Sequence, residues 1–180
     1  MNYKTDLIKK ISNSTNWPGF ERANFLDELD EICNQAFDKG TIEGYLASLL
    51  IYQQLSEEII KQLLKDAQFF IQLSVFPAEI QFSEKQRLTF GQVIDEFKTT
   101  ISFQNKNEII SACQELNKHR IEFVHGLTKR TSLKDIGQQV SKVRDLYIEI
   151  YKLSTQAHDN FRLSFKDFKK DIDWNDYLNE

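Results

Sequence analysis

The chain has 180 residues, of which 41% are hydrophobic, and this length suffices for one domain with a core of its own. Only six Gly and two Pro are present, too few for the many turns of a β-sandwich or barrel, so the composition predicts an all-α fold. The net charge of −4 disfavours binding to nucleic acid through overall charge.

Cysteine usage and hydropathy indicate the compartment. Cys33 and Cys113 lie far apart, and neither has a second Cys or a His at metal-ligand spacing, so both are interpreted as small core residues in a reducing cytoplasm. The first residues are not followed by an apolar signal segment, and no run approaches the roughly 18 apolar residues that span a bilayer. We therefore expect a soluble, cytoplasmic protein without a membrane partner.

Apolar residues recur at helical spacing along most of the chain, which predicts a compact bundle of about five to six helices in a single domain, residues 1–180. The expected helices cover residues 3–11, 20–37, 41–75, 89–97, 108–125 and 133–153. The third helix either continues to Val75 or breaks near Asp66, and the last either ends near Leu153 or continues past Phe161. The acidic, aromatic residues 171–180 are expected to be a docked or frayed end.

Local signals mark several helix ends. Pro18 is expected in the first turn of the second helix, where proline is favoured, and Gly40 at its C-terminal cap. The segments 89–92 and 132–135 have the pattern of capping boxes, with Thr or Ser first and a polar acceptor three residues later.

The helix that ends at Gly126 carries a charge within its apolar stripe. At about 100° per residue, Arg120 lies near the middle of that stripe. An unpaired buried charge costs several kcal/mol or more. Either Arg120 pairs inside the fold, with Glu57 or Glu58 as candidate partners, or this face borders a polar cleft. The stripe is expected to consist of Ile109, Cys113, Leu116, Val124 and Leu127.

Basic residues and histidines crowd the same region of the chain. The simplest interpretation is a solvated helix end, where His125 would hydrogen-bond the last carbonyls. No Gly-rich phosphate loop, Gly-x-Ser-x-Gly elbow or His-Glu-x-x-His metal helix is present, so neither a cofactor nor a metal is expected. Acid–base chemistry by Arg120 and His125 is what remains. The crowded residues are Lys118, His119, Arg120, His125, Lys129, Arg130 and Lys134.

The run Arg120-Ile121-Glu122-Phe123-Val124-His125 resembles the Arg-x4–6-His signature of HEPN domains (higher eukaryotes and prokaryotes nucleotide-binding). The all-helical setting over residues 41–153 is similar to that family as well. The resemblance implies a metal-independent endoribonuclease of toxin–antitoxin or phage-defence type. It would act on RNA as a homodimer, and an antitoxin protein would be a further partner.

The resemblance also implies roles for residues. His125 would be a general acid or base, and Arg120 would hold the scissile phosphate and stabilise negative charge. Lys118 and His119 would support them. Active members commonly have Asn directly after the arginine, whereas this chain has Ile121. The alternative is a non-catalytic HEPN-like helical module for dimerisation, protein interaction, or RNA or nucleotide binding.

Overall fold

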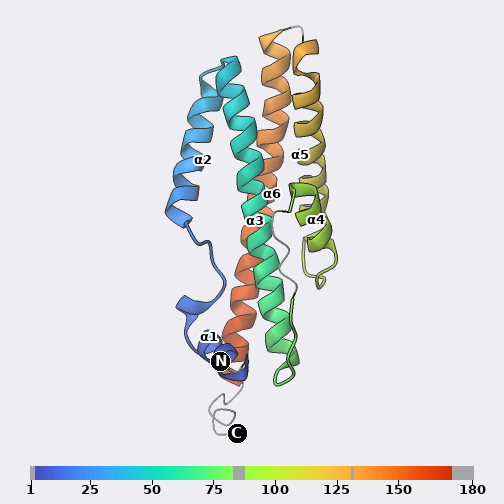
Figure 1. The fold of residues 1–180 in the computed structure, drawn as a ribbon. Coiled ribbons are helices and arrows are strands. Elements are labelled where there is room, and N and C mark those ends of the chain that lie inside the picture. The colour runs from blue at the N-terminus through green and yellow to red at the C-terminus, as the bar shows by residue number, and fades with distance from the viewer. Residues whose placement is uncertain (1–2, 83–87, 131, 172–180) are drawn as a thin grey trace.

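The structure is a computed structural model that describes residues 3–82, 88–130 and 132–171, and two long parallel helices form its axis (Figure 1). Within those residues the chain forms six α-helices and no strand, which confirms the predicted all-α fold. The helices are α1 (Tyr3–Ser12), α2 (Ala23–Asp38), α3 (Ile42–Val75), α4 (Phe90–Lys98), α5 (Lys106–Gly126) and α6 (Leu133–Asp171), with short 3-10 turns η1 (Ser14–Asn16) and η2 (Leu127–Lys129).

The central pair, α3 and α6, runs the length of the molecule (Figure 1). α3 continues for 34 residues without the break considered near Asp66, and α6 continues past Phe161 to Asp171. Packing explains both lengths, because buried residues recur along α3 from Gly44 to Leu73 and along α6 from Ile136 to Phe165. A Cβ on Gly137 of α6 would lie 2.7 Å from the Tyr45 hydroxyl, so the pair is in close contact near one end.

α2 and α5 flank this pair in the upper half of the molecule. α2 packs against α3, and α5 packs against α6, so that both helix turns, α2–α3 and α5–α6, lie at the same end (Figure 1). Gly40 follows α2 with φ of +63°, as expected of a glycine that ends a helix. A Cβ on Gly44 would lie 2.2 Å from the carbonyl oxygen of Ala36, so α2 and α3 approach closely.

A second apolar cluster fills the lower half, where α1 packs against α3 and α6. Trp17 is buried in it and donates its indole N–H to the Ile11 carbonyl at 3.1 Å. The Arg162 guanidinium lies over the Trp17 ring and donates to the Pro18 carbonyl. These contacts hold the chain outside helical geometry here, so α2 begins at Ala23 and the expectation of Pro18 in its first turn was wrong.

The two predicted capping boxes have different outcomes. At Thr89 both reciprocal hydrogen bonds with Gln92 are present, which confirms the capping box of α4. At Ser132 the structure gives the bond from the Asp135 amide to the Ser132 hydroxyl at 3.2 Å, one half of the motif.

A buried lysine ties the end of α4 to the start of α5. Lys106, 6% exposed, donates to the carbonyls of Lys98 and Thr100, and burial lowers the pKa of its ammonium group.

Other expectations concern cysteines, membranes and the tail. Cys33 and Cys113 are fully buried free thiols, which confirms their assignment to the core, and burial raises the pKa of Cys33 to about 12. None of the helices in the described ranges is long and apolar enough to cross a membrane. Apart from Asp171, the residues predicted as the tail lie outside the described residues.

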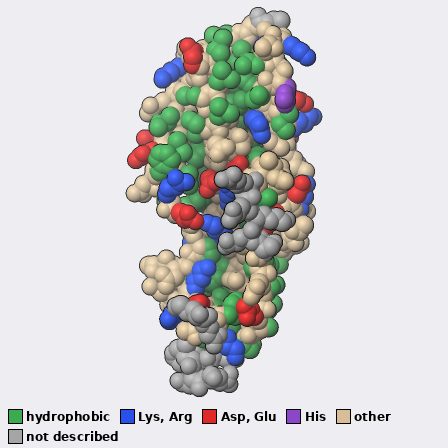
Figure 2. All heavy atoms as spheres, in the orientation of Figure 1, with side chains coloured by type: hydrophobic (Ala, Val, Ile, Leu, Met, Phe, Trp, Pro, Cys, Tyr) green, Lys and Arg blue, Asp and Glu red, His purple; other side chains and the backbone are tan. Residues whose placement is uncertain are grey.

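One face of the upper half is apolar although it is exposed. In the orientation of Figure 1, apolar side chains gather over the upper part of the surface (Figure 2). The exposed large apolar residues of this half include Ile42 and Leu50 of α3, and Ile121 and Val124 of α5, which are 41% to 51% exposed. Contiguous exposed apolar patches commonly mark association sites.

Candidate functional site

Arg120 lies where the sequence predicts it, within the buried stripe of α5. Leu116 and Phe123, one turn before and one turn after it, are 0% and 1% exposed. Val124, which was assigned to the stripe, is instead 47% exposed, because the buried face continues through Phe123. Arg120 itself is half-buried, and the Nε of its guanidinium is buried.

The guanidinium of Arg120 is incompletely satisfied. Its Nη2 donates to Asn117 Oδ1 at 3.4 Å, a long hydrogen bond, and its Nε is buried without a partner among the described residues. By comparison, Arg130 and Arg144 each have a carboxylate oxygen within 4 Å, at 3.3 and 3.9 Å. Of the half-buried arginines in the described ranges, Arg120 and Arg162 have no carboxylate within 4 Å. Arg162 has the Pro18 carbonyl and His158 as partners, whereas Arg120 has, among the described residues, only the Asn117 amide.

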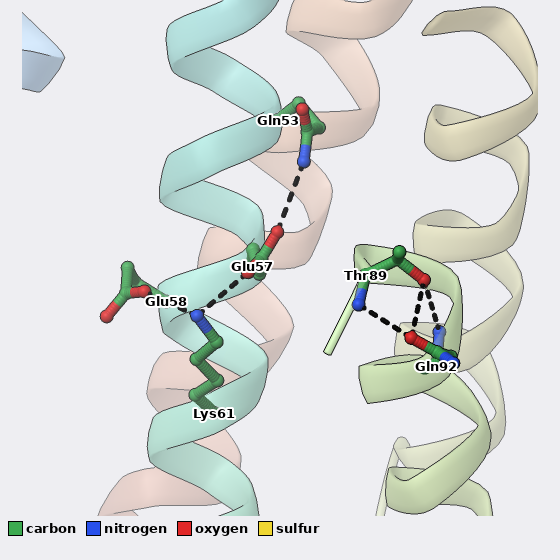
Figure 3. Close-up of polar contacts among 6 residues, drawn as sticks. All are labelled: Gln53, Glu57, Glu58, Lys61, Thr89 and Gln92. Carbon is green, nitrogen blue, oxygen red and sulfur yellow. Dashed lines mark hydrogen bonds and ion pairs between the residues drawn. The ribbon is translucent and has the colours of Figure 1, made fainter. Parts of the chain in front are cut away.

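The candidate partners on the central helix have other contacts. Figure 3 shows Glu57 between Gln53 and Lys61, with Glu58 reaching the same lysine. The Lys61 ammonium lies 2.8 Å from Glu57 and 2.9 Å from Glu58. Neither carboxylate is a contact of Arg120, so the internal salt bridge considered from the sequence does not form.

Arg120 and His125 do not converge within one chain. α5 remains helical through Gly126, so the two residues are about 140° apart around the axis and about 7.5 Å apart along it. His125 is exposed in the last turn. The 140° arc between them is exposed and contains Val124 and Ile121, at about 40° and 100° from Arg120.

The two supporting candidates point in different directions from Arg120. His119 has its Nε2 3.6 Å from a Glu115 carboxylate oxygen, and its Nδ1 is buried without a partner among the described residues. Lys118 is exposed and lines a groove between α4 and α5. Within the described ranges, neither side chain forms a hydrogen bond with Arg120.

The groove beside Lys118 has a volume of about 430 Å³ and brings in a residue that the sequence did not identify. Asn117, the hydrogen-bond partner of Arg120, lines it together with Ile121. A Cβ on Gly91 would lie 3.7 Å from Asn117 Nδ2, so the first turn of α4 lies beside this amide. The lining residues are Gly91, Ile94, Asp95, Gln114, Asn117, Lys118, Ile121 and Glu122.

The end of the molecule that carries this site has a local positive charge. Residues 118–135 contain five Lys and Arg and two acidic residues, whereas the whole chain has a net charge of −4. One of the acidic residues, Asp135, is paired with Arg130. The local field therefore favours an anionic ligand near Arg120 even though the overall charge does not.

A larger groove of about 1000 Å³ lies elsewhere, between α3, α4 and residues 18–22. Its charged residues largely pair with one another, since Lys65 contacts Glu21 at 2.9 Å and Lys61 contacts Glu57. Such a surface has no net preference for one sign of charge. The larger groove therefore does not indicate a ligand of particular charge, whereas the region around Arg120 indicates an anionic one.

Comparisons of the chain with protein-family models, with curated proteins and with solved structures gave no match. Within the described ranges, no three His, Cys, Asp or Glu side chains form a group that could hold a metal ion. The fold and the site together define an all-α bundle with a basic segment around the α5–α6 turn. In this segment Arg120 has no carboxylate partner among the described residues, and the exposed Ile121 and Val124 lie on the same helix.

Proposed function

We propose that the chain is a HEPN-like, metal-independent endoribonuclease that works as a homodimer, with Arg120 and His125 as its catalytic residues. The observation that carries this proposal is the state of Arg120. A half-buried guanidinium with one long amide contact, and no carboxylate among the described residues, is suited to bind an RNA phosphate through its bidentate fork. The assignment to toxin–antitoxin or phage-defence systems, with an antitoxin partner, rests on the sequence resemblance.

The exposed arc of α5 supports the dimer. Ile121 and Val124 lie between Arg120 and His125, both around the helix and along it. In a two-fold symmetric contact, residue i of one protomer meets residue j of the other, and the reverse pair forms as well. A contact centred on Ile121 and Val124 therefore brings Arg120 of one protomer opposite His125 of its partner, which removes the 140° separation within one helix.

The reaction needs only groups that RNA, this pair and solvent water supply. One His125 takes the proton from a ribose 2′-hydroxyl, whose oxygen attacks the neighbouring phosphorus. The P–O5′ bond breaks, a 2′,3′-cyclic phosphate forms, and the leaving 5′-oxygen takes a proton from solvent water, while His125 returns its proton to solvent. Arg120 holds the phosphate and stabilises the negative charge that develops on it. Each of the two sites in the dimer thus combines Arg120 of one protomer with His125 of the other.

A second candidate function is a HEPN-like module that associates without chemistry, or that binds RNA or nucleotides without cleaving them. Ile121 favours it, because an exposed isoleucine beside Arg120 suits packing and cannot hydrogen-bond a ligand. The two candidates differ in what Arg120 does. The ribonuclease needs its charge, whereas a packing module would tolerate an apolar residue there.

The test is cleavage of RNA by purified, dimeric protein in the presence of EDTA. We expect product ends with 2′,3′-cyclic phosphate, and loss of cleavage in Arg120→Ala and in His125→Ala. Lys152→Ala, an exposed basic residue of α6 outside the segment 118–135, is the matched control and should retain cleavage. Intact RNA after incubation with a folded dimer would refute the proposed activity and leave the non-catalytic module.

A further inference from the structure

We infer that Asn117 is the positioning residue for Arg120, in place of a polar residue at position 121. The effect of Asn117 on catalysis rests on the proposed function. The hydrogen bond between Asn117 and Arg120 is present in the free protein and does not depend on it. Asn117 touches no reacting atom in this account. Its role is to hold the guanidinium of Arg120 in the orientation that receives a phosphate.

The geometry points to this role through two contacts of one amide group. Asn117 lies three residues before Arg120, so both are on neighbouring lines of α5, and Oδ1 accepts the hydrogen bond from Arg120 Nη2 at 3.4 Å. The Nδ2 of the same side chain lies beside Gly91, where an added Cβ would be 3.7 Å away. The first turn of α4 therefore packs against the amide whose other end holds Arg120.

Asn117 is suited to the task because its oxygen accepts a hydrogen bond without carrying charge. A carboxylate at this position would hold Arg120 more strongly but would neutralise the cation that the phosphate needs. The distance of 3.4 Å is long for a hydrogen bond, as is common before substrate is bound, and we expect it to shorten when an anion fixes the guanidinium.

The residue at position 121 cannot orient Arg120 by a hydrogen bond, so another residue has to do so. Ile121 lines the same groove as Asn117, one helical turn further along, and its side chain has no hydrogen-bonding group. An amide placed at 121 would therefore enter the groove that Asn117 also lines. The chain carries the amide at 117, and we infer that this is a relocation of the orienting group by one turn.

The experiment measures cleavage kinetics of four dimeric variants. The bond to Arg120 is long in the free protein but should reach the strength usual for a charged donor once phosphate is bound. Its removal in Asn117→Ala is therefore predicted to lower kcat about tenfold with little change in KM. Asn117→Asp should lower kcat/KM further, because it neutralises Arg120. The double variant Asn117→Ala with Ile121→Asn should recover most of the lost kcat. Asn107→Ala, an exposed asparagine on the same helix, is the control and should match the parent.

A second measurement keeps the inference separate from the proposed function. In the free protein, the guanidinium N–H signals of Arg120, assigned with Arg120→Lys, should shift in Asn117→Ala and stay in place in Asn107→Ala. If the parent protein does not cleave RNA, the proposed function fails while these spectra still test the contact. Full kcat in Asn117→Ala, failure of the double variant to recover kcat, or unshifted Arg120 signals would each overturn the inference.

Discussion

Replacing Arg120 by leucine separates a functional arginine from a structural one. Leucine continues the buried stripe between Leu116 and Phe123 and removes a charge that has no carboxylate partner among the described residues. If Arg120 is kept for phosphate, Arg120→Leu should stabilise the fold while abolishing cleavage. If it is kept for the fold, the same change should destabilise it.

The magnitude follows from the contacts of the guanidinium. The variant loses one long hydrogen bond to an amide, worth about 0.5 kcal/mol, and removes a buried unsatisfied N–H, which costs about 1–3 kcal/mol. Because Arg120 is half-buried, we discount the gain for solvent screening to about 1 kcal/mol. For a chain of this length, that corresponds to a rise in Tm of about 3 °C.

The assay is thermal unfolding followed by circular dichroism, at a fixed protein concentration because dimerisation also affects Tm. Arg130→Leu is the matched control, since its Nε is likewise buried without a partner among the described residues but its guanidinium lies 3.3 Å from the Asp135 carboxylate. Loss of this ion pair offsets the gain, so Tm should be unchanged or slightly lower. A fall in Tm of several degrees for Arg120→Leu would refute the reasoning, because it would make Arg120 a structural residue.

The remaining predictions concern the fold and are read by denaturant unfolding. Gly44→Ala should lower the free energy of unfolding by about 3 kcal/mol or more, because its Cβ would lie 2.2 Å from the Ala36 carbonyl oxygen. Gly126→Ala, whose Cβ would have nothing within 4 Å, should raise it by about 0.5 kcal/mol. Equal effects of the two substitutions would contradict the close α2–α3 packing. Asp66→Ala should lose about 3 kcal/mol, since Asp66 is fully buried and pairs with His158 at 2.6 Å; an unchanged midpoint would contradict that role.

The helices were predictable from sequence because the apolar spacing is continuous, but their ends depended on distant residues. Asp66 interrupts the apolar pattern of α3 and made a break plausible. Its partner His158 lies 92 residues later, so no local pattern reveals that this carboxylate is paired inside the bundle. The late start of α2 has a similar cause, since the Pro18 carbonyl accepts its hydrogen bond from Arg162, 144 residues away.

The site was predictable only in part for the same reason. Arg120 stood out because a charge occupies an apolar stripe, a feature that one helix displays by itself. Asn117 did not, because asparagine is ordinary on a helix surface, and its position beside Gly91 exists only once α4 packs on α5. The assignment of Val124 to the core failed because the buried side of α5 continues through Phe123 instead.

The most direct test of the central claim mixes two inactive proteins. Arg120→Ala and His125→Ala protomers are combined under conditions that exchange subunits. If Arg120 acts with His125 of the partner protomer, each mixed dimer contains one intact site. Random mixing of equal amounts should then restore about a quarter of the parent cleavage rate. No activity in a mixture that demonstrably contains mixed dimers would contradict the account.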